Sequence, residues 1–224
     1  MRRAIELEPT YSLALALAAW CEARRAVYNW TDDLEAAKSE GLRLARLAGD
    51  LKSDDPTVLT MLCAAHSVAR DFHLASRLIE KALVLDPNSA WAWNRSGWLH
   101  AYLSQPDIAI EHFERAVRLS PLDPMNFNCY IGTGAAHFVA GRYTDAVAWL
   151  EKGLLENPSA IWAYRELAPA YAHLGQIADA QKGIDALLRE YPKLTIAKVS
   201  NALAYAPGTL TRIVDGLRKA GLAE

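Results

Sequence analysis

The sequence predicts an all-α fold, a solenoid of stacked antiparallel helix pairs, from a repeat and from the residue pattern within it. Pro87, Pro121, Pro158 and Pro192 follow one another at intervals of 34, 37 and 34 residues. Before each proline, apolar or small residues recur at positions i, i+4 and i+7, which places them on one face of an α-helix. Self-similarity at this period indicates units that bury their apolar faces against one another.

The second helix of each unit carries small residues around a larger apolar one. In the clearest unit these are Ala109, Phe113 and Ala116, followed by Pro121. The small residues let a neighbouring helix approach closely, and the proline ends the helix because it has no backbone N–H to donate. The equivalent residues in the other units are Ala75, Ile79 and Ala82, then Ala146, Leu150 and Gly153, then Ala180, Ile184 and Leu187.

The first helix of each unit repeats a large residue, a small residue and a ring-bearing residue at the same spacing. In the unit that begins at Ala90 these are Trp93, Gly97 and His100. Glycine-containing turns, such as the one at Gly141, separate the first helix from the second. The equivalent residues in the other units are Leu59, Cys63 and His66, then Tyr130, Gly134 and His137, then Tyr164, Ala168 and Tyr171.

A helix–turn–helix unit of about 34 residues with these positions resembles the tetratricopeptide repeat (TPR). Departures from the family pattern are modest: histidine replaces the usual tyrosine in three units, and Gly153 and Leu187 replace an alanine. The resemblance implies a right-handed superhelix whose first helices line a concave groove and whose second helices form the convex back. It also implies that the partner of the groove is a protein or a peptide.

The repeat divides a single predicted domain, residues 1–224, into four segments. Residues 56–192 hold four units in register, and residues 12–55 form a looser first unit with helices over 12–27 and 34–51. In that unit, Asp32 and Glu35 are spaced as a helix-capping pair. Residues 193–224 lose the register and predict two closing helices, 194–204 and 210–222, that cap the solenoid.

Residues 1–9 repeat the end of a second helix whose first half is missing. A solenoid cut through a helix exposes an apolar face that natural arrays cover with a capping repeat. We therefore expect this chain to be a fragment of a longer protein, and a naturally irregular first helix is the alternative.

Composition narrows the classes of partner and compartment. The net charge is −2, which gives no electrostatic reason to expect nucleic acid or a membrane surface as partner. The apolar run from Leu13 to Cys21 is far shorter than the roughly 20 residues that span a bilayer. Cys21, Cys63 and Cys129 show no paired spacing, which favours a reducing, cytoplasmic location.

Two further stretches narrow the resemblance. The turn at residues 30–33 and the closing stretch 216–224 are similar to the C-terminal TPR region of class III adenylate/guanylate cyclases from alpha-proteobacteria. Related TPR tails occur on winged-helix transcriptional regulators. This resemblance implies a regulatory, protein-binding segment of a larger bacterial signalling protein. A free-standing TPR adaptor is the alternative, and a cryptic enzyme is a third.

Helical spacing predicts a cluster of aromatic and polar residues on the groove side. Aromatic anchors beside an arginine are typical of peptide-binding surfaces, where few residues supply most of the binding energy. Packing against a neighbouring helix or the cap is the alternative, and a contact between two copies of the chain is the third. The predicted groove residues are Trp91, Asn94, Trp98, Tyr102, Asn128, Phe138, Trp162 and Arg165.

Catalytic, metal-binding and cofactor-binding motifs are not recognisable in this sequence. His66, His100 and His137 recur once per unit, but consecutive helices pack about 8–10 Å apart. Zinc–nitrogen bonds are about 2.0–2.1 Å, so these histidines cannot converge on one ion. We therefore predict no enzymatic activity for this chain, and a catalytic domain elsewhere in a longer protein stays open.

Two positions bear on the shape and chemistry of the groove. Pro169 falls inside a first helix and is expected to kink it, because proline removes a helix hydrogen bond. The chaperone-type groove that clamps a C-terminal carboxylate needs lysine, asparagine and arginine on successive first helices. Thr60, Ala64, Gly132 and Ala135 occupy several of those positions, so that ligand is not expected.

Overall fold

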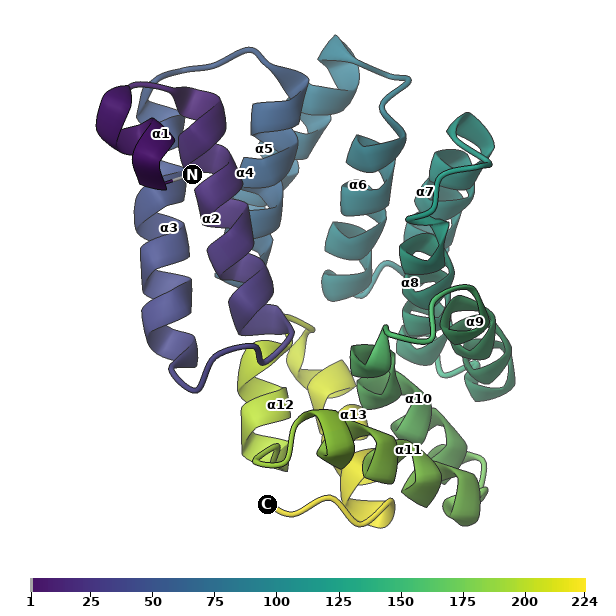
Figure 1. The fold of residues 1–224 in the computed structure, drawn as a ribbon. Helices are drawn as coiled ribbons and strands as arrows, with labels where there is room; N and C mark the ends of the chain where they lie inside the picture. The colour runs from purple at the N-terminus through teal and green to yellow at the C-terminus, as the bar shows by residue number, and fades with distance from the viewer. Residues whose placement is uncertain (1) are drawn as a thin grey trace.

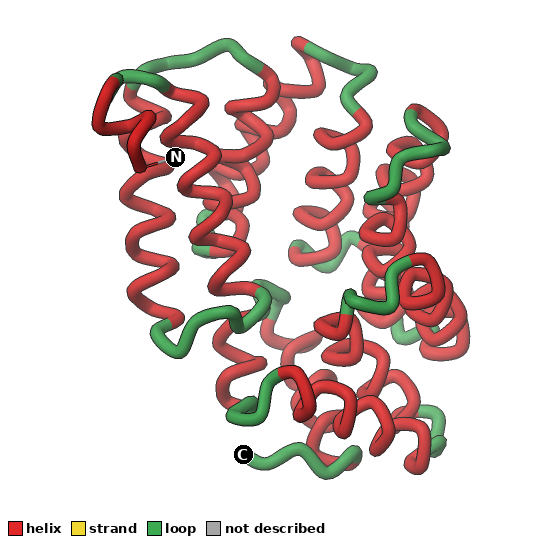
Figure 2. The backbone as a smooth tube through the Cα atoms, viewed as in Figure 1, coloured by secondary structure: helices red, strands yellow, loops and turns green. Residues whose placement is uncertain are grey.

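The computed structural model describes residues 2–224, and within this range the chain is helical with no strand. Met1, the first residue of the predicted truncated repeat, lies outside the described residues. The helices run antiparallel in consecutive pairs, as the ribbon and the backbone tube show (Figures 1 and 2). The predicted all-α solenoid is confirmed.

The helices begin and end close to the predicted bounds. The first unit and the four units after it comprise α2 Ser12–Val27, α3 Leu34–Asp50, α4 Pro56–Val68, α5 Phe72–Leu85, α6 Ala90–Tyr102, α7 Pro106–Leu119, α8 Asn126–Val139, α9 Tyr143–Glu156, α10 Tyr164–His173 and α11 Ile177–Glu190. A short 3-10 turn, Ile161–Ala163, precedes α10. The remaining helices are α1 Arg2–Leu7, α12 Ile196–Ala202 and α13 Pro207–Lys219.

Two local predictions need correction. The residue that caps α3 is Asp33, whose side chain accepts a hydrogen bond from the Ala36 backbone N–H at 2.9 Å. Asp32 instead lies 3.7 Å from Lys193 and 3.6 Å from Lys198 in the C-terminal region of the chain. The first closing helix is shorter than predicted, at 196–202, because residues 203–206 are not helical. The second keeps its predicted length but is shifted to 207–219, because Pro207 begins it.

The small positions of the repeat let one aromatic ring fit between two first helices. Phe113 of α7 is fully buried, and its ring lies against the backbones of Gly97 in α6 and Gly132 in α8. A Cβ atom at Gly132 would lie 2.3 Å from Phe113 Cζ, and one at Gly97 would lie 2.7 Å from Phe113 Cε1. Glycine is therefore required here by space, since any side chain would displace the ring.

Pro169 marks the place where the C-terminal helix docks. Helix α10 continues through Pro169 to His173, and Pro169 is buried. A Cβ atom at Gly216 of α13 would lie 2.6 Å from Pro169 Cα, so the backbones of α10 and α13 approach very closely at this point. Pro169 thus forms a portion of the surface that receives the last helix.

The solenoid curls so far that its two ends meet. Helices α12 and α13 lie beneath the ends of α2 and α3, next to α10 and α11 (Figure 1). Asn29, after α2, donates a hydrogen bond to the Lys198 carbonyl at 3.4 Å, and Lys38 of α3 donates to the Asn201 carbonyl at 2.7 Å. The concave side is consequently bounded by first helices and closed at one end by the C-terminal region.

Candidate functional site on the concave face

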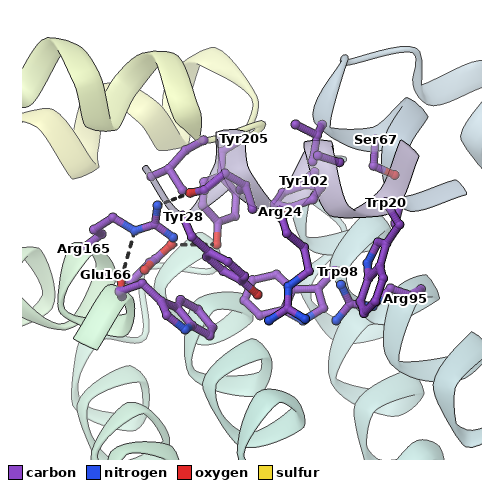
Figure 3. A pocket seen from close by; sticks show the side chains of 16 residues that line it. Trp20, Arg24, Tyr28, Ser67, Arg95, Trp98, Tyr102, Arg165, Glu166 and Tyr205 are labelled. Atoms are coloured by element: carbon purple, nitrogen blue, oxygen red, sulfur yellow. Dashed lines mark hydrogen bonds between the residues drawn. The ribbon is translucent and has the colours of Figure 1, made fainter. Parts of the chain in front are cut away.

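Consecutive first helices pack side by side along the inner side of the solenoid. Contacts join α2 to α4, α4 to α6, α6 to α8 and α8 to α10. Side chains from the second half of α2 face α6 and α10 across this inner side, as the close-up shows for Trp20, Arg24 and Tyr28 opposite Trp98 and Arg165 (Figure 3). Two regions of this concave face differ sharply in how they are filled.

An extended stretch of the protein itself fills the lower region. Leu203, Ala204 and Tyr205 connect α12 to α13 without helical structure, and all three are buried. The Ala206 N–H donates to the Tyr102 carbonyl at 3.2 Å, and Arg70 donates to the Leu203 carbonyl at 2.8 Å. The cavity left beside this stretch has a volume of about 40 Å³. That space suits water and nothing larger.

A buried carboxyl group lies at the bottom of this lower region. The Glu166 side chain is 1% exposed, and its Oε1 accepts a hydrogen bond from the Tyr205 hydroxyl at 3.3 Å (Figure 3). Its Oε2 has no hydrogen-bond partner among the described residues. Burial raises the pKa of Glu166 to about 7, although the neighbouring Arg165 guanidinium opposes this shift.

Arg165 itself joins the two ends of the solenoid. Its Nε donates to the Trp162 carbonyl at 2.9 Å, and its Nη1 donates to the Val27 carbonyl of α2. The Tyr28 ring, next to Val27, packs against Trp162 at a tilt of 32° with ring centroids 4.9 Å apart. Arg165 is 3% exposed, so it acts here as an internal cross-link between α2 and α10.

Most of the predicted groove residues are packed rather than exposed. Trp91 is half-buried, whereas the other seven are buried. Trp98 donates from its indole to Asn128 Oδ1 at 2.9 Å and lies 5.7 Å from the Phe113 ring. Among them, Trp98 and Tyr102 line the same small cavity as Leu203 and Tyr205, so these two aromatic rings are packed rather than exposed. The assignment of the eight residues to a binding groove stays a prediction.

Phe138 is separated from the other predicted residues. It is fully buried, and its ring packs 5.3 Å from Tyr143 and 5.9 Å from His173. The Arg212 guanidinium of α13 lies 5.9 Å from the same ring. The structure thus places Phe138 in the core beneath the cap, away from the open end of the concave face.

The upper region of the concave face remains open. A pocket of about 400 Å³ lies between the middle of α2, the start of α6 and the start of α8. Four predicted residues line it, namely Trp91, Asn94, Asn128 and Trp162. Its other lining residues are Trp20, Arg24, Tyr28, Ala90, Arg95, Ala116, Asp123, Met125, Asn126, Phe127 and Cys129.

Two arginines give the open pocket a positive character. Arg95 donates from Nε to Asn94 Oδ1 at 2.9 Å and from Nη2 to Asn128 Oδ1 at 2.7 Å. Arg24 lies over aromatic rings, with its Cζ 4.9 Å from the Trp20 centroid and 5.3 Å from the Tyr28 centroid. Within the portion of the chain that the structure describes, no carboxylate forms an ion pair with either arginine.

Sequence reasoning missed the residues that α2 contributes. Trp20 and Arg24 are four residues apart and share one face of α2, and Tyr28, the residue that follows its last turn, continues the same spacing. The same spacing rule that selected the α6 residues could have found them. They were overlooked because the first unit departs from the repeat pattern, so its register gave no guide to which face meets the groove.

The pKa values of the buried thiols and imidazoles favour their neutral forms at neutral pH. Burial raises the pKa of the Cys63 thiol to about 12, and burial also raises the pKa of Cys129, which accepts a hydrogen bond from Asn94. Neither is a thiolate at neutral pH, which is the reactive form of cysteine. Desolvation lowers the pKa of His66 and His137. Among residues 2–224, no three metal-binding side chains converge on one point.

Comparison with protein families decides the family. Two family models, both for the tetratricopeptide repeat, match residues 65–124 and 94–161 in one case and residues 137–204 in the other. Together they cover more than half of the 224 residues. The chain belongs to the tetratricopeptide-repeat family. It is thus a protein-interaction module, whereas the finer resemblance to the TPR region of nucleotide cyclases is not shown by these matches.

Individual relatives and solved structures are also similar to this chain. Superkiller complex protein 3 of Homo sapiens is 31% identical over 90 residues, which make up 40% of this TPR chain and 6% of that protein. The crystal structure of PilW, a type IV pilus biogenesis factor, has a TM-score of 0.62 at 17% identity and covers 90% of this chain and 88% of that one. The Cut9–Hcn1 hetero-tetramer structure gives 0.68 at 19% identity, covering 90% and 38%.

These similarities establish the fold and the family of the chain. Both structural neighbours are below 25% identity, so they support the solenoid architecture alone. The chain spans only 6% of the length of the human relative, and the activity of that whole protein does not transfer to it. A search of residues 2–224 finds no helix long and apolar enough to cross a bilayer.

Proposed function

We propose that this TPR module binds an extended peptide segment of a partner protein in the open pocket between α2, α6 and α8. The observation that carries the proposal is the contrast in filling along one concave face. Its lower region is occupied by the protein's own extended stretch 203–206, and its upper region keeps a pocket of about 400 Å³. A volume of this size lies within the roughly 300–1,000 Å³ of typical ligand pockets.

The pocket walls have the composition of a binding surface. Trp20 of α2 and Trp91 of α6 form an edge-to-face pair with centroids 5.5 Å apart, and both are only half-buried. Tryptophan and arginine are the residue types most enriched among the few that dominate interface energetics. Since Arg24 and Arg95 lie beside these tryptophans, a small number of contacts can supply most of the affinity.

The internal stretch shows how this face holds an extended chain. Main-chain groups of residues 203 and 206 bond to Arg70 and to the Tyr102 carbonyl, while the Tyr205 ring packs 5.2 Å from the Tyr102 ring. A partner peptide in the open pocket would meet the same combination of aromatic rings, amides and guanidinium groups. The mode of recognition is therefore side-chain anchoring of an extended backbone.

Selection from a displayed library of random nine-residue peptides tests the proposal. We expect the wild-type protein to enrich a peptide family and the Trp91→Ala variant to lose its binding. Trp93→Ala is the matched control, since Trp93 lies two residues along α6, faces His112 at 4.8 Å on the far side, and is half-buried like Trp91. Equal loss in both variants, or no enriched peptide, would contradict the proposal.

The module serves as a scaffold or adaptor segment under this proposal, in preference to the regulatory tail of a cyclase. Support comes from the family matches, which are to the repeat itself and not to a cyclase region. Purification of the protein from its own cells with an antibody, followed by mass spectrometry of the purified polypeptide, tests this preference. A cyclase domain in the same polypeptide would contradict it.

A further inference from the structure

We infer that the open pocket selects peptides with an acidic side chain next to an aromatic or large apolar one. This inference rests on the proposed peptide-binding function and adds the chemistry of the ligand. It follows from three features of the pocket: unpaired positive charge, buried donors that lack acceptors, and aromatic walls with space between them.

The positive charge comes from two different helices that face the same space. Arg24 projects from α2 and Arg95 from α6, and both line the pocket. Arg95 is held by the side-chain oxygens of Asn94 and Asn128, which are neutral. Neutral amides orient a guanidinium without neutralising it, so its charge remains available for an incoming carboxylate.

Buried donors without acceptors provide independent support. The indole Nε1 of Trp20 and the Nε of Arg24 are both shielded from solvent and have no hydrogen-bond partner among the described residues. A buried donor left unpaired costs roughly 1–3 kcal/mol, more when it is charged. Both side chains line the open pocket and also the small cavity below it, so an acceptor that reaches these atoms from the open pocket would relieve this cost.

One carboxylate stands against the two guanidinium groups among the described residues that line the pocket. Asp123 is the carboxylate among the described lining residues, and its Oδ1 accepts the Met125 backbone N–H at 2.8 Å. That bond ties Asp123 to the turn before α8, and Asp123 forms no ion pair within the described chain. Two guanidinium groups against one carboxylate leave a net positive pocket on a chain whose overall charge is −2.

The aromatic walls set the second requirement on the ligand. Trp20, Tyr28, Trp91 and Trp162 surround the same space that the two arginines line. Arginine stacked on aromatic rings keeps its edge free for hydrogen bonds while its face is covered. An acidic side chain at that edge brings its neighbouring residue against the rings, where an aromatic or large apolar side chain buries most surface.

Selection from two displayed libraries of random nine-residue peptides tests the inference. One library contains all residue types, and the other replaces every Asp and Glu by Asn or Gln. We expect enrichment from the first library only, with Asp or Glu adjacent to an aromatic or large apolar residue. Removing the guanidinium in Arg24→Gln or Arg95→Gln should weaken binding of the enriched peptide roughly tenfold to a hundredfold, the range for charge-assisted hydrogen bonds.

Matched variants separate charge from folding. Arg115→Gln removes an arginine that stacks on Trp93 on the far side of α6, at 4.4 Å from the ring, and should leave binding unchanged. Arg24→Lys and Arg95→Lys keep the positive charge and should retain more affinity than the glutamine variants. A thermal melt of each variant confirms that the fold is intact.

The failure of this inference differs from the failure of the proposed function. Enriched peptides without acidic residues would overturn acid selectivity, as would Arg24→Gln and Arg95→Gln variants that bind the enriched peptide as tightly as the wild type does. Loss of binding in Trp91→Ala would still support the pocket. Enriched peptides that bind Trp91→Ala as tightly as wild type would overturn both. Enrichment of acidic peptides that Arg115→Gln also fails to bind would assign the selectivity to another face.

Discussion

The two regions of the concave face share α2 and α6 yet differ in how they are filled. In the lower region, Tyr102 and Glu166 contact Tyr205 of the extended stretch, and Trp98 lines the cavity of about 40 Å³ beside it. In the upper region, Trp20, Trp91 and the two pocket arginines face a pocket of about 400 Å³. Aromatic residues on a groove-facing helix therefore do not identify a binding surface until it is known what covers them.

The largest expected effect is the loss of folding stability when Trp98 of the lower region is truncated. Trp98 is 7% exposed and bonded to Asn128, so Trp98→Ala leaves a cavity and removes one of the two hydrogen bonds that Asn128 Oδ1 accepts. We expect it to lower the free energy of unfolding by about 3–5 kcal/mol. Chemical denaturation measures the loss. A loss below about 1 kcal/mol would show that the lower region is not a packed core.

The pH dependence of stability probes the buried carboxyl of the lower region. The folded-state pKa of Glu166 is about 7, above the ordinary value of 4.5, so the folded protein holds this proton more tightly than the unfolded chain does. Stability contributed by the protonated form is complete below pH 4.5 and is lost as the pH rises through 7. A shift from 4.5 to 7 corresponds to about 3 kcal/mol.

Glu166→Gln isolates this contribution. We expect the variant to lose less stability than the wild type between pH 4.5 and about 8, with the difference reaching about 3 kcal/mol. Desolvation lowers the pKa of His66, His112 and His137, which destabilises the folded state as the pH falls below 6.5. These histidines are present in both proteins, so the comparison cancels them. Parallel pH profiles would contradict the burial of an unpaired Glu166 oxygen.

An intermediate effect tests the docking of the last helix that anchors the lower region. In Gly216→Ala, the new Cβ would lie 2.6 Å from the Pro169 backbone, so α13 must move away from α10. We expect a loss of roughly 1–3 kcal/mol by overpacking. Gly208→Ala is the control on the same helix, because its Cβ would meet nothing within 4 Å. Equal melting temperatures for the two variants would contradict the close contact.

The smallest expected effect on stability belongs to the open pocket. Trp91 is half-buried, with one side packed against Trp20 and the N-terminal core and the other bordering the open pocket, so Trp91→Ala should lower stability by about 1 kcal/mol, less than Trp98→Ala. The same change should abolish peptide binding, which isothermal titration can follow. Trp98→Ala, in contrast, is expected to act mainly on stability. A Trp91→Ala variant that unfolds as readily as Trp98→Ala would contradict the distinction between the two regions.

The architecture could be predicted because repeat packing is a local property. Residues such as Phe113, Gly97 and Gly132 obey a short-range pattern, and the same contact recurs from unit to unit. Helix starts were also readable, as at Pro56 after Asp55, whose side chain accepts the Thr57 N–H. Errors were limited to one residue at the cap of α3 and to the bounds of the closing helices.

The site could be predicted only partially because it depends on contacts between distant residues. The curl that brings Arg165 to Val27 joins positions 138 residues apart, and the stretch at Leu203 reaches Arg70 across 133 residues. No periodicity within one helix encodes such meetings. The spacing rule therefore selected residues of α6 that line the two concave cavities, but it could not tell that Trp98 is covered while Trp91 borders the open pocket.

The most direct test is an NMR titration of ¹⁵N-labelled protein with the enriched acidic nine-residue peptide. The account predicts that the indole N–H signals of Trp20 and Trp91 shift on binding, while that of Trp93 does not. The Ala206 amide should keep its protection from exchange, since its bond to the Tyr102 carbonyl stays intact. Shifts confined to Trp93, or release of the Ala206 amide on binding, would show that the peptide binds elsewhere or displaces the internal stretch.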